Sequence, residues 1–466
     1  VKLKSPLQRH GVARFTSLAY GKPGELLFGR ALHPLRYGLG LEVGSGRVVP
    51  EVKYWPSRSA DESGRLVEEF SSITRGVLER AVDLGVQALQ LETELSHVAT
   101  LNPRLAEEIV AAQKDVMERY HSEYGVALAL RVTVADVRWS RELKGEEAFS
   151  RMMESFEAAA GAGADVLSIE SIGGKEVFDY SIVRGDLRGI ALGLAVLAPA
   201  DVERLWREVS SIASRSGALA GGDSACGFAN TAMKLAGGFK SRMLPHVLAA
   251  VVRAMSAPRT LKAFEAGARG PGKDCAYENV FIKVITGYPI SMEGKTSAVA
   301  HSSLVGNVAA AACDLWSNEQ VENVKLFGGT GPQVFLEILH YDCQLMNTAL
   351  KAGKGEELRD LLVASNLYTD PQSLVLSPQA AWEIASAIVA EIDDYRRAVA
   401  AARRALEIVK RECEAGRLAL DTREAAYLRK LERELGALPD SADGLLESAR
   451  FYEERANFKV SDYLKD

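Results

Sequence analysis

The sequence predicts an α/β fold, in which a closed TIM (β/α)8 barrel is favoured over an open, doubly wound sheet. Short apolar runs alternate with segments of helical period over most of the chain. Short strands separated by helices are typical of parallel sheets that are buried on both faces. Acidic residues follow the ends of the predicted strands, where such folds place their active sites. They are Glu92, Glu94, Asp136, Glu170 and Asp223. We therefore expect a polar pocket at the carboxyl ends of the strands.

The first 60 residues are predicted to form an irregular N-terminal segment with one hairpin. Residues 40–56, GLEVGSGRVVPEVKYWP, show apolar alternation on both sides of a Gly-Ser-Gly turn, which is typical of hairpins. The barrel is expected over residues 61–377, because helices and strands alternate there. Its helix–strand pairs, in chain order, are 59–85 with 86–94, 102–125 with 126–136, 146–163 with 164–171, 199–217 with 218–227, and 297–316 with 323–331.

The helices are predicted from their caps and from the spacing of their apolar residues. The helix at 102–125 starts with a capping Asn102 and has Pro103 at its first helical position. The helix before it carries one apolar stripe at helical spacing, formed by Leu66, Phe70, Ile73, Val77 and Ala81.

Two further regions are expected to be helical. Residues 231–271 form a helical insertion in the barrel, and residues 378–466 form a C-terminal helical extension. Packing of the extension on the barrel is favoured over a dimer or partner interface. The hairpin or residues 279–286 can supply the strands that the barrel still needs. The extension begins with one long helix, whose apolar stripe contains Trp382, Ile388, Ile392, Tyr395 and Val399.

The composition excludes several classes of protein. The formal net charge is −6, and no basic stripe with interleaved aromatic residues is present, so no nucleic-acid partner is expected. No apolar run reaches the roughly 18 residues of a membrane helix, so no membrane partner is expected either. The basic N-terminus lacks the apolar stretch of a secretory signal, and a cytoplasmic protein is the default expectation.

The cysteines and histidines limit the kind of metal site that is possible. The chain has five cysteines, and an odd number in a large acidic protein argues against a disulfide framework. The seven histidines are scattered and form no metal-binding pair. Any metal site is therefore expected to use thiolate and carboxylate ligands.

Three residues are candidate metal ligands, because each lies at a predicted strand end or turn. Glu170 ends a predicted strand. Cys226 lies between a strand and a helix, where helix-terminal N–H groups favour the thiolate form that binds zinc. Cys275 follows a Gly-Pro-Gly turn, and Lys273 adds positive charge beside it. In a closed barrel all three can meet at one mouth, and they would leave the fourth position of a catalytic zinc open.

Other interpretations remain open from the residues alone. The wide spacing of these ligands matches no short metal motif, so two ordinary buried cysteines are the alternative. Cys313 and Cys343 are expected in the core or on a packed helix face, and Cys413 is expected to be incidental. Residues 327–333, FGGTGPQ, can be a tight turn between a strand and a helix or a phosphate cradle.

The segments around the candidate ligands closely resemble the methanol–cobalamin methyltransferase family. The resemblance runs from about residue 15 to the C-terminus, and residues 1–14 have no usable counterpart. The similar strings are TSLAYGKPGELLFGRALHPLRYGLGLEVGSGRVVPEVKYWP, LQLETE, ALRVTVADVR, DVLSIES, GGDSACGFANTAMKLA and GPGKDCAYENVFIKVITGYPISMEGKTSA. The resemblance implies a TIM barrel with one catalytic Zn²⁺ per chain, held at the positions of Glu170, Cys226 and Cys275. It also implies a homodimer that binds a small corrinoid protein.

The chemistry implied by the resemblance is transfer of the methyl group of methanol to cob(I)alamin on that corrinoid partner. Zinc would act as a Lewis acid on the methanol oxygen, because hydroxide is a poor leaving group. The partner's cobalt(I) would be the nucleophile. Two thiolates and a carboxylate soften the acidity of the metal, so a proton donor to the departing oxygen is plausible. The candidates for that donor, or for groups that support the metal ligands, are Asp223, Asp274, Glu92 and Glu94.

Three alternative functions compete with methanol activation. The first is a cobamide methyltransferase with another methyl donor, such as a methoxylated compound. The second is a zinc-dependent barrel hydrolase, but that class usually uses histidines, and the matched sites contain none. The third is a non-catalytic scaffold for the corrinoid protein, against which the intact Glu170, Cys226 and Cys275 argue.

Overall fold

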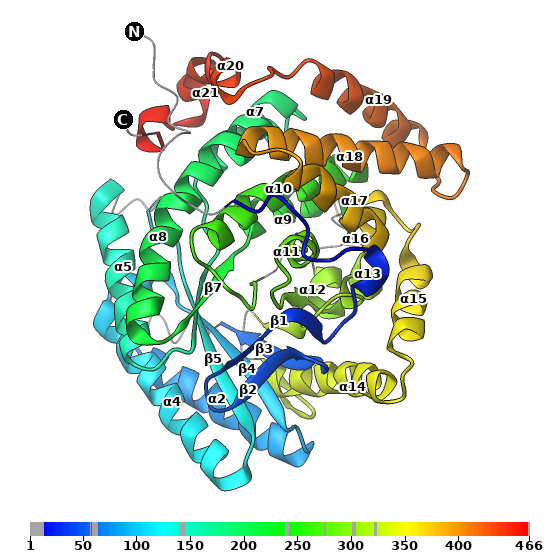
Figure 1. The fold of residues 1–466 in the computed structure, drawn as a ribbon. Coiled ribbons are helices and arrows are strands. Elements are labelled where there is room, and N and C mark those ends of the chain that lie inside the picture. The colour runs from blue at the N-terminus through cyan, green and yellow to red at the C-terminus, as the bar shows by residue number, and fades with distance from the viewer. Residues whose placement is uncertain are drawn as a thin grey trace.

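The structure is a computed structural model, and it shows a ring of helices around a curled sheet (Figure 1). It describes residues 14–55, 57, 64–138, 145–237, 242–273, 276–300, 304–320 and 324–464. None of the helices in these ranges is both long and apolar enough to cross a bilayer.

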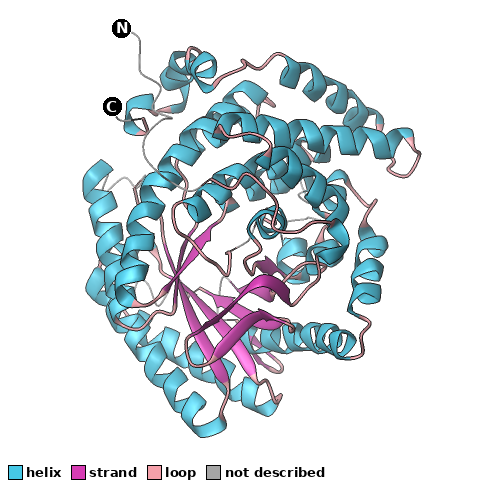
Figure 2. Ribbon diagram, in the orientation of Figure 1, coloured by secondary structure: helices cyan, strands magenta, loops and turns pink. Residues whose placement is uncertain are grey.

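The core of the fold is a parallel sheet of seven strands (Figure 2). Its strand order is β7-β6-β5-β4-β3-β9-β8, so the strands follow the chain except where β3 meets β9. The strands are β3 (Val49–Tyr54), β4 (Ala88–Glu94), β5 (Ala127–Val134), β6 (Val166–Ile169), β7 (Leu219–Asp223), β8 (Ser291–Glu293) and β9 (Leu315–Gln320).

Residues 269–273, here called the closing segment, join the two edges of this sheet. The backbone N–H of Arg269 donates to the carbonyl of Ala220 on β7 at 2.8 Å. On the other side, the N–H of Gly272 donates to the carbonyl of Pro289 at 2.9 Å, and the N–H of Ser291 on β8 donates to the carbonyl of Gly272 at 2.8 Å. The segment therefore occupies the position of an eighth strand, and the predicted TIM-type barrel is confirmed over the open sheet.

The helices after the strands form the outer layer of the barrel. Neighbours in this layer contact one another in the order α14, α2, α4, α5, α8, α10. The cap predicted for α4 is present, since the Asn102 side chain accepts a hydrogen bond from Leu105 N and Pro103 is the first helical residue. These helices are α2 (Leu66–Asp83), α4 (Pro103–Tyr124), α5 (Gly145–Gly161), α8 (Ala198–Ser216), α10 (His246–Glu265) and α14 (Gly331–Lys351).

The N-terminal end of the barrel is closed by an apolar layer. Hairpin β1–β2 lies across it, and the N–H of Leu39, between its strands, donates to the carbonyl of Leu128 on β5 at 2.7 Å. The hairpin consists of β1 (Arg30–Tyr37) and β2 (Leu41–Ser45). The layer is a separate buried cluster of Tyr37, Leu41, Val43, Val49, Ala88, Ala129, Val166 and Leu315. Because this end is closed, a ligand must enter from the carboxyl ends of the strands.

The hairpin predicted at residues 40–56 is wrong in its pairing. β2 pairs with β1 before it, and residues 49–54 are the first barrel strand, parallel to β4 and β9. Charged residues alternate with apolar ones in β3, as on a solvated hairpin face. Their side chains instead point into a polar barrel interior, where they find partners of opposite charge.

Three further predictions of secondary structure need correction. Residues 279–286 form helix α11 (Asn279–Thr286) and supply no strand. The strand predicted at 323–331 lies earlier, at β9, and residues 325–330 form a short hairpin of β10 (Lys325–Leu326) and β11 (Gly329–Thr330). The helix of the predicted insertion, α10, is a regular member of the outer layer.

The C-terminal extension packs on the barrel, as predicted. Its first part is two helices, α17 (Pro378–Val389) and α18 (Asp394–Glu414), because Asp393 caps a new helix by accepting from Arg396 N. α18 contacts α10, and α17 contacts α11. Within the predicted apolar stripe, Ile388 and Tyr395 are buried, whereas Ile392 lies in the break and is 68% exposed.

Candidate active site

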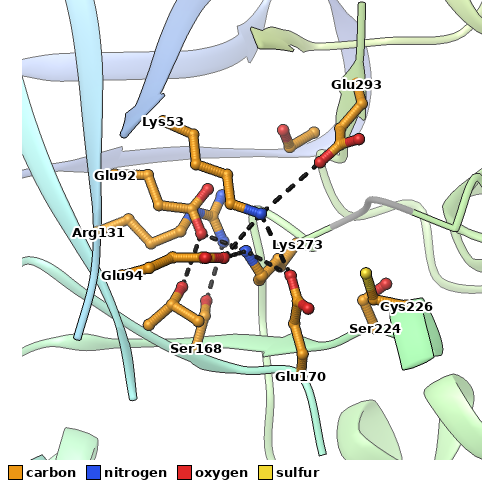
Figure 3. A network of polar contacts seen from close by, with 12 residues as sticks. Lys53, Glu92, Glu94, Arg131, Ser168, Glu170, Ser224, Cys226, Lys273 and Glu293 are labelled. Carbon is orange, nitrogen blue, oxygen red and sulfur yellow. Dashed lines mark hydrogen bonds and ion pairs between the residues drawn. The ribbon is translucent and has the colours of Figure 1, made fainter. Parts of the chain in front are cut away.

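Charged side chains from several strands fill the carboxyl end of the barrel (Figure 3). Alternate residues of a strand point to the same face, and β3, β4 and β8 each turn charged residues inward, while Glu170 directly follows β6. Lys53 and Glu92 are register partners on neighbouring strands. The closing segment adds Lys273, whose side chain is only 2% exposed. The inward-facing groups at this level are Lys53, Glu92, Glu94, Glu170, Lys273 and Glu293.

Two lysines and two glutamates form a ring of alternating charge. The Lys53 ammonium lies 2.7 Å from Glu94 Oε1 and 3.2 Å from Glu170 Oε1. The Lys273 ammonium lies 3.1 Å from the same oxygen of Glu94 and 3.2 Å from the same oxygen of Glu170. Among the described residues, Glu293 is a further carboxylate partner of Lys53, at 3.7 Å, and Glu92 is a further partner of Lys273. A buried charge is tolerated only when it is paired and hydrogen-bonded, and the ring meets that condition.

A second polar layer lies below this ring. The Arg131 guanidinium, fully buried, pairs with Glu51 at 2.8 Å and donates to the Ser168 hydroxyl at 2.9 Å. It also donates to the carbonyl of Pro271 at 3.0 Å. Arg131 thereby ties the closing segment, which carries Lys273, to the strands of the sheet.

The charges of the two layers shift one another's pKa values. Burial alone would raise the pKa of Glu92, but Lys273, Lys53 and Arg131 lower it to about 2. Burial disfavours the charged form of Lys273, yet Glu92, Glu94 and Glu170 raise its pKa well above the ordinary value. Glu51 and Glu92 raise the pKa of Arg131 in the same way, against the effect of burial. Glu92, Lys273 and Arg131 are therefore charged at neutral pH.

Glu170 and Cys226 lie at the carboxyl ends of two neighbouring strands. Ile169 on β6 pairs with Asp223 on β7, so Glu170 follows this pair by one residue and Cys226 by three. Cys226 is the first residue of helix α9 (Cys226–Gly237), so the helix begins at the thiol itself and not after it, as the sequence had suggested. Figure 3 shows the Glu170 carboxylate and the Cys226 thiol pointing toward the same space above the strands. The Glu170 side chain is 26% exposed, so it can be reached from that side.

The predicted metal site lies partly outside the described residues. Asp274 and Cys275 lie outside the described residues, and within those residues no three His, Cys, Asp or Glu side chains are grouped as a metal would need. The two described donors fit the zinc that the resemblance implies. They are a carboxylate and a thiol on adjacent strand ends, and the Asn230 amide supports the thiol by donating to Cys226 Sγ at 2.9 Å.

Asp223, a predicted proton donor, points away from the barrel interior. Its carboxylate accepts from Ser171 N at 3.0 Å, from Ser171 Oγ at 2.7 Å and from Trp206 Nε1 at 2.9 Å. It also pairs with the buried guanidinium of Arg259 at 2.9 Å. Both of its oxygens are thus used to hold the segment after Glu170 against the helical layer.

Asp136, which follows β5, also binds the segment after Glu170. It pairs with Arg138 at 2.6 Å and accepts from Ile172 N at 3.0 Å. Burial would raise its pKa, but Arg138 lowers it below the ordinary value. Of the carboxylates expected in the pocket, Glu92, Glu94 and Glu170 lie there, whereas Asp136 and Asp223 face the helices.

Sequence reasoning missed Glu51, the partner of Arg131, and three further charged residues of this site. Lys53, Arg131 and Glu293 were not predicted to belong to it. These side chains face the barrel interior, as Glu92 does. That shared direction can be recognised only once the pairing register of the strands is known. The remaining cysteines agree with prediction, since Cys313 and Cys343 are buried in the core and Cys413 is half-buried.

Comparisons with known proteins identify the family of the chain. The family model of the methanol-cobalamin methyltransferase B subunit matches residues 12–464. The chain belongs to this family. A curated methanol–corrinoid protein co-methyltransferase of Methanosarcina barkeri (strain Fusaro) is 44% identical over 457 residues, covering 97% of this chain and 99% of that protein. The resemblance inferred from the sequence is confirmed, and with it the expectation of a methyltransferase.

A solved structure supports the fold over the same length. It is the methanol:cobalamin methyltransferase complex MtaBC from Methanosarcina barkeri, and one of its chains matches with 43% sequence identity and a TM-score of 0.93. The match covers 97% of this chain and 99% of that chain.

Proposed function

We propose that this chain transfers the methyl group of methanol to the cobalt of a corrinoid carried by a partner protein, with a zinc ion held by Glu170, Cys226 and Cys275. Family membership over nearly the whole chain is the observation that carries the proposal. The meeting of Glu170 and Cys226 at the open end of the barrel supports the metal site.

The methyl carbon of methanol is hard to attack, because hydroxide is a poor leaving group. Zinc, when bound, would supply a Lewis acid for the methanol oxygen. The chain's own residues hold the site in shape. Glu170 and Cys226 offer ligands, and Lys53 and Lys273, themselves paired with Glu94, contact one oxygen of the Glu170 carboxylate. The nucleophile is the cobalt(I) of the partner's corrinoid, so this chain needs none of its own.

The partner is expected to cover the carboxyl ends of the strands. The N-terminal end of the barrel is closed by hairpin β1–β2 and the apolar layer, so the corrinoid can reach Glu170 and Cys226 from one side only. The complex named in the similar solved structure supports a bound partner. A homodimer, which the resemblance implies, is part of the proposal and is tested by light scattering at micromolar concentration.

The deciding experiment measures methylation of cob(I)alamin by methanol with the zinc-loaded chain. A parallel reaction with a methoxylated aromatic compound tests the alternative donor. We expect methylcobalamin from methanol, no product from the aromatic compound and loss of activity in Glu170→Gln. Cys413→Ala, a change on the C-terminal helix α18, is the control and should leave activity intact. Methylation by the aromatic compound but not by methanol would identify the methoxylated compound as the methyl donor. Absence of methylation with both compounds would support a non-catalytic scaffold.

A further inference from the structure

The Glu170 carboxylate is held by two ammonium groups through one oxygen. Lys53 and Lys273 each lie 3.2 Å from Glu170 Oε1. The lysines come from parts of the chain that are far apart in sequence, strand β3 and the segment that closes the barrel. Their side chains are 3% and 2% exposed. Neither lysine is a plausible zinc ligand while it is charged, because a protonated amine has no lone pair to donate.

The lysines are themselves fixed in place. Both contact Glu94 Oε1, so each is held between two carboxylates of the ring. Lys273 gains a further anchor from its backbone, since the Asn279 amide donates to the Lys273 carbonyl at 2.5 Å. A Glu side chain loses considerable rotamer freedom when it is ordered, and rigid charged neighbours remove that freedom before a metal arrives.

We propose that Lys53 and Lys273 are positioning residues, which orient the Glu170 carboxylate so that it binds zinc tightly. This inference rests on the zinc ligand set of the proposed function and extends it to two residues that do not touch the metal. Partners of this kind, which hydrogen-bond a metal ligand, typically change metal affinity by about 10- to 100-fold when they are removed.

Charge and position act on zinc affinity in opposite directions. A positive charge close to the site repels Zn²⁺, so loss of an ammonium group would tighten zinc binding if charge alone mattered. Loss of a positioning contact would weaken zinc binding, because the carboxylate must then be ordered by the metal itself. The sign of the change therefore decides between the two roles.

The experiment measures the dissociation constant of zinc by competition with a chelator for Lys53→Met and Lys273→Met. Methionine keeps the length and volume of lysine without its charge. We expect zinc binding about 10- to 100-fold weaker in each variant. The double variant should lose less than the product of the two single losses, because both lysines act on the same oxygen.

Lys283→Met is the matched control. Lys283 on α11 is fully buried and pairs with Asp314 at 2.9 Å, outside the site. Its removal should lower stability but leave zinc affinity within about twofold of that of the unaltered chain, so general destabilisation cannot imitate the expected result. Circular dichroism identifies any variant that does not fold. If Lys53→Met or Lys273→Met does not fold, the glutamine variant at the same position, which keeps a hydrogen-bond donor, replaces it.

A spectroscopic measurement adds a readout independent of activity. With Co²⁺ in place of zinc, the visible ligand-field bands report the geometry of the ligands. We expect these bands to change in the two site variants and to stay the same in Lys283→Met. Unchanged bands together with equal or tighter zinc binding in Lys53→Met and Lys273→Met would overturn the inference.

Failure of the inference is distinguishable from failure of the proposed function. If Glu170→Gln retains full zinc affinity, the ligand assignment is wrong and the positioning role falls with it. If the chain binds zinc through Glu170 but does not methylate cob(I)alamin, the activity is wrong, whereas the effect of the lysines on zinc affinity still stands.

Discussion

The Asp223 carboxylate accepts both the backbone N–H and the hydroxyl of Ser171, at 3.0 and 2.7 Å. This pair joins the end of β7 to the residue that follows Glu170. Asp223 also compensates the buried charge of Arg259. Its position favours a structural role over the proton transfer for which it was a candidate.

Asp223→Asn should therefore lower the stability of the fold. The change leaves the Arg259 guanidinium buried without its carboxylate, and breaking a buried pair from one side costs about 3–5 kcal/mol. Urea unfolding measures the loss. In the protein that remains folded, the pH profile of methyl transfer should keep its shape. A stable variant whose transfer rate has dropped about 100-fold would instead identify Asp223 as the acid.

The zinc ligands make a second prediction. Cys226→Ala and Cys275→Ala should each lose most of the one zinc expected per chain, because two protein ligands hold zinc far less tightly than three. Elemental analysis of the purified variants measures the metal. Cys313→Ala is the control, since Cys313 is fully buried in the core and its thiol donates to the Ala310 carbonyl at 3.3 Å. Full zinc retention in both site variants would rule out the ligand set.

Hydrophobic period predicted those parts of the barrel that have an apolar face toward the core. Helix α4 has such a stripe and a capping Asn102, and its bounds agree with the prediction. Strand β8 was missed because it is short and two of its residues, Ser291 and Glu293, face the charged interior. β3 was assigned to a hairpin for the same reason, since Glu51 and Lys53 looked like solvent-facing positions.

Only those site residues that lie at the end of a single predicted strand could be inferred from the sequence. Glu170 and Cys226 end or follow apolar strands, so their position could be inferred without the register. The partners of Glu170 could not be inferred in this way. Lys53 on β3 meets Glu170 only because β3 and the end of β6 face the same barrel interior, and such long-range pairings depend on barrel closure.

Glu92 gives a prediction about pH. Its pKa of about 2 in the folded chain lies below the ordinary 4.5, because the effect of three cations outweighs that of burial. Protonation therefore opposes folding: the stabilising contribution of Glu92 is fully present above pH 4.5 and is lost as the pH falls toward 2. Glu92→Gln should lower stability at neutral pH and make acid unfolding less steep in that range. Chemical denaturation at several pH values measures both effects, and parallel stability curves for the two proteins would contradict them.

The loop after Glu170 is tested by a change at Gly173. A Cβ atom there would overlap the carboxylate of Asp201, which is held by the buried Arg138 and cannot move away. Gly173→Ala should cost about 1–3 kcal/mol, as over-packing typically does, and should weaken zinc binding because the loop is displaced.

Gly161→Ala is the matched control for this change. A Cβ on Gly161, in helix α5, meets nothing within 4 Å, so the variant should be neutral or more stable by up to about 1 kcal/mol. Thermal unfolding and zinc competition compare the two variants. Equal behaviour would show that the loop does not depend on Asp201.

The last prediction concerns the path of the methyl group. Cys226 and Cys275 are both proposed zinc ligands, and cobalt(I) is a far stronger nucleophile than a zinc-bound thiolate. We expect cobalt to attack the methyl carbon directly, so that the C–O bond breaks as the Co–C bond forms and hydroxide takes the electron pair. One displacement inverts the methyl carbon, whereas a methylated cysteine would require two displacements and give net retention. Methanol made chiral with hydrogen isotopes, followed through a single transfer to cobalamin, distinguishes the two paths. Mass spectrometry after incubation with methanol alone provides a second check, with the half-buried Cys413 as the internal control for unspecific alkylation. Retention at carbon, or a methyl group found on Cys226 or Cys275 and not on Cys413, would show that the enzyme carries the methyl group before cobalt does.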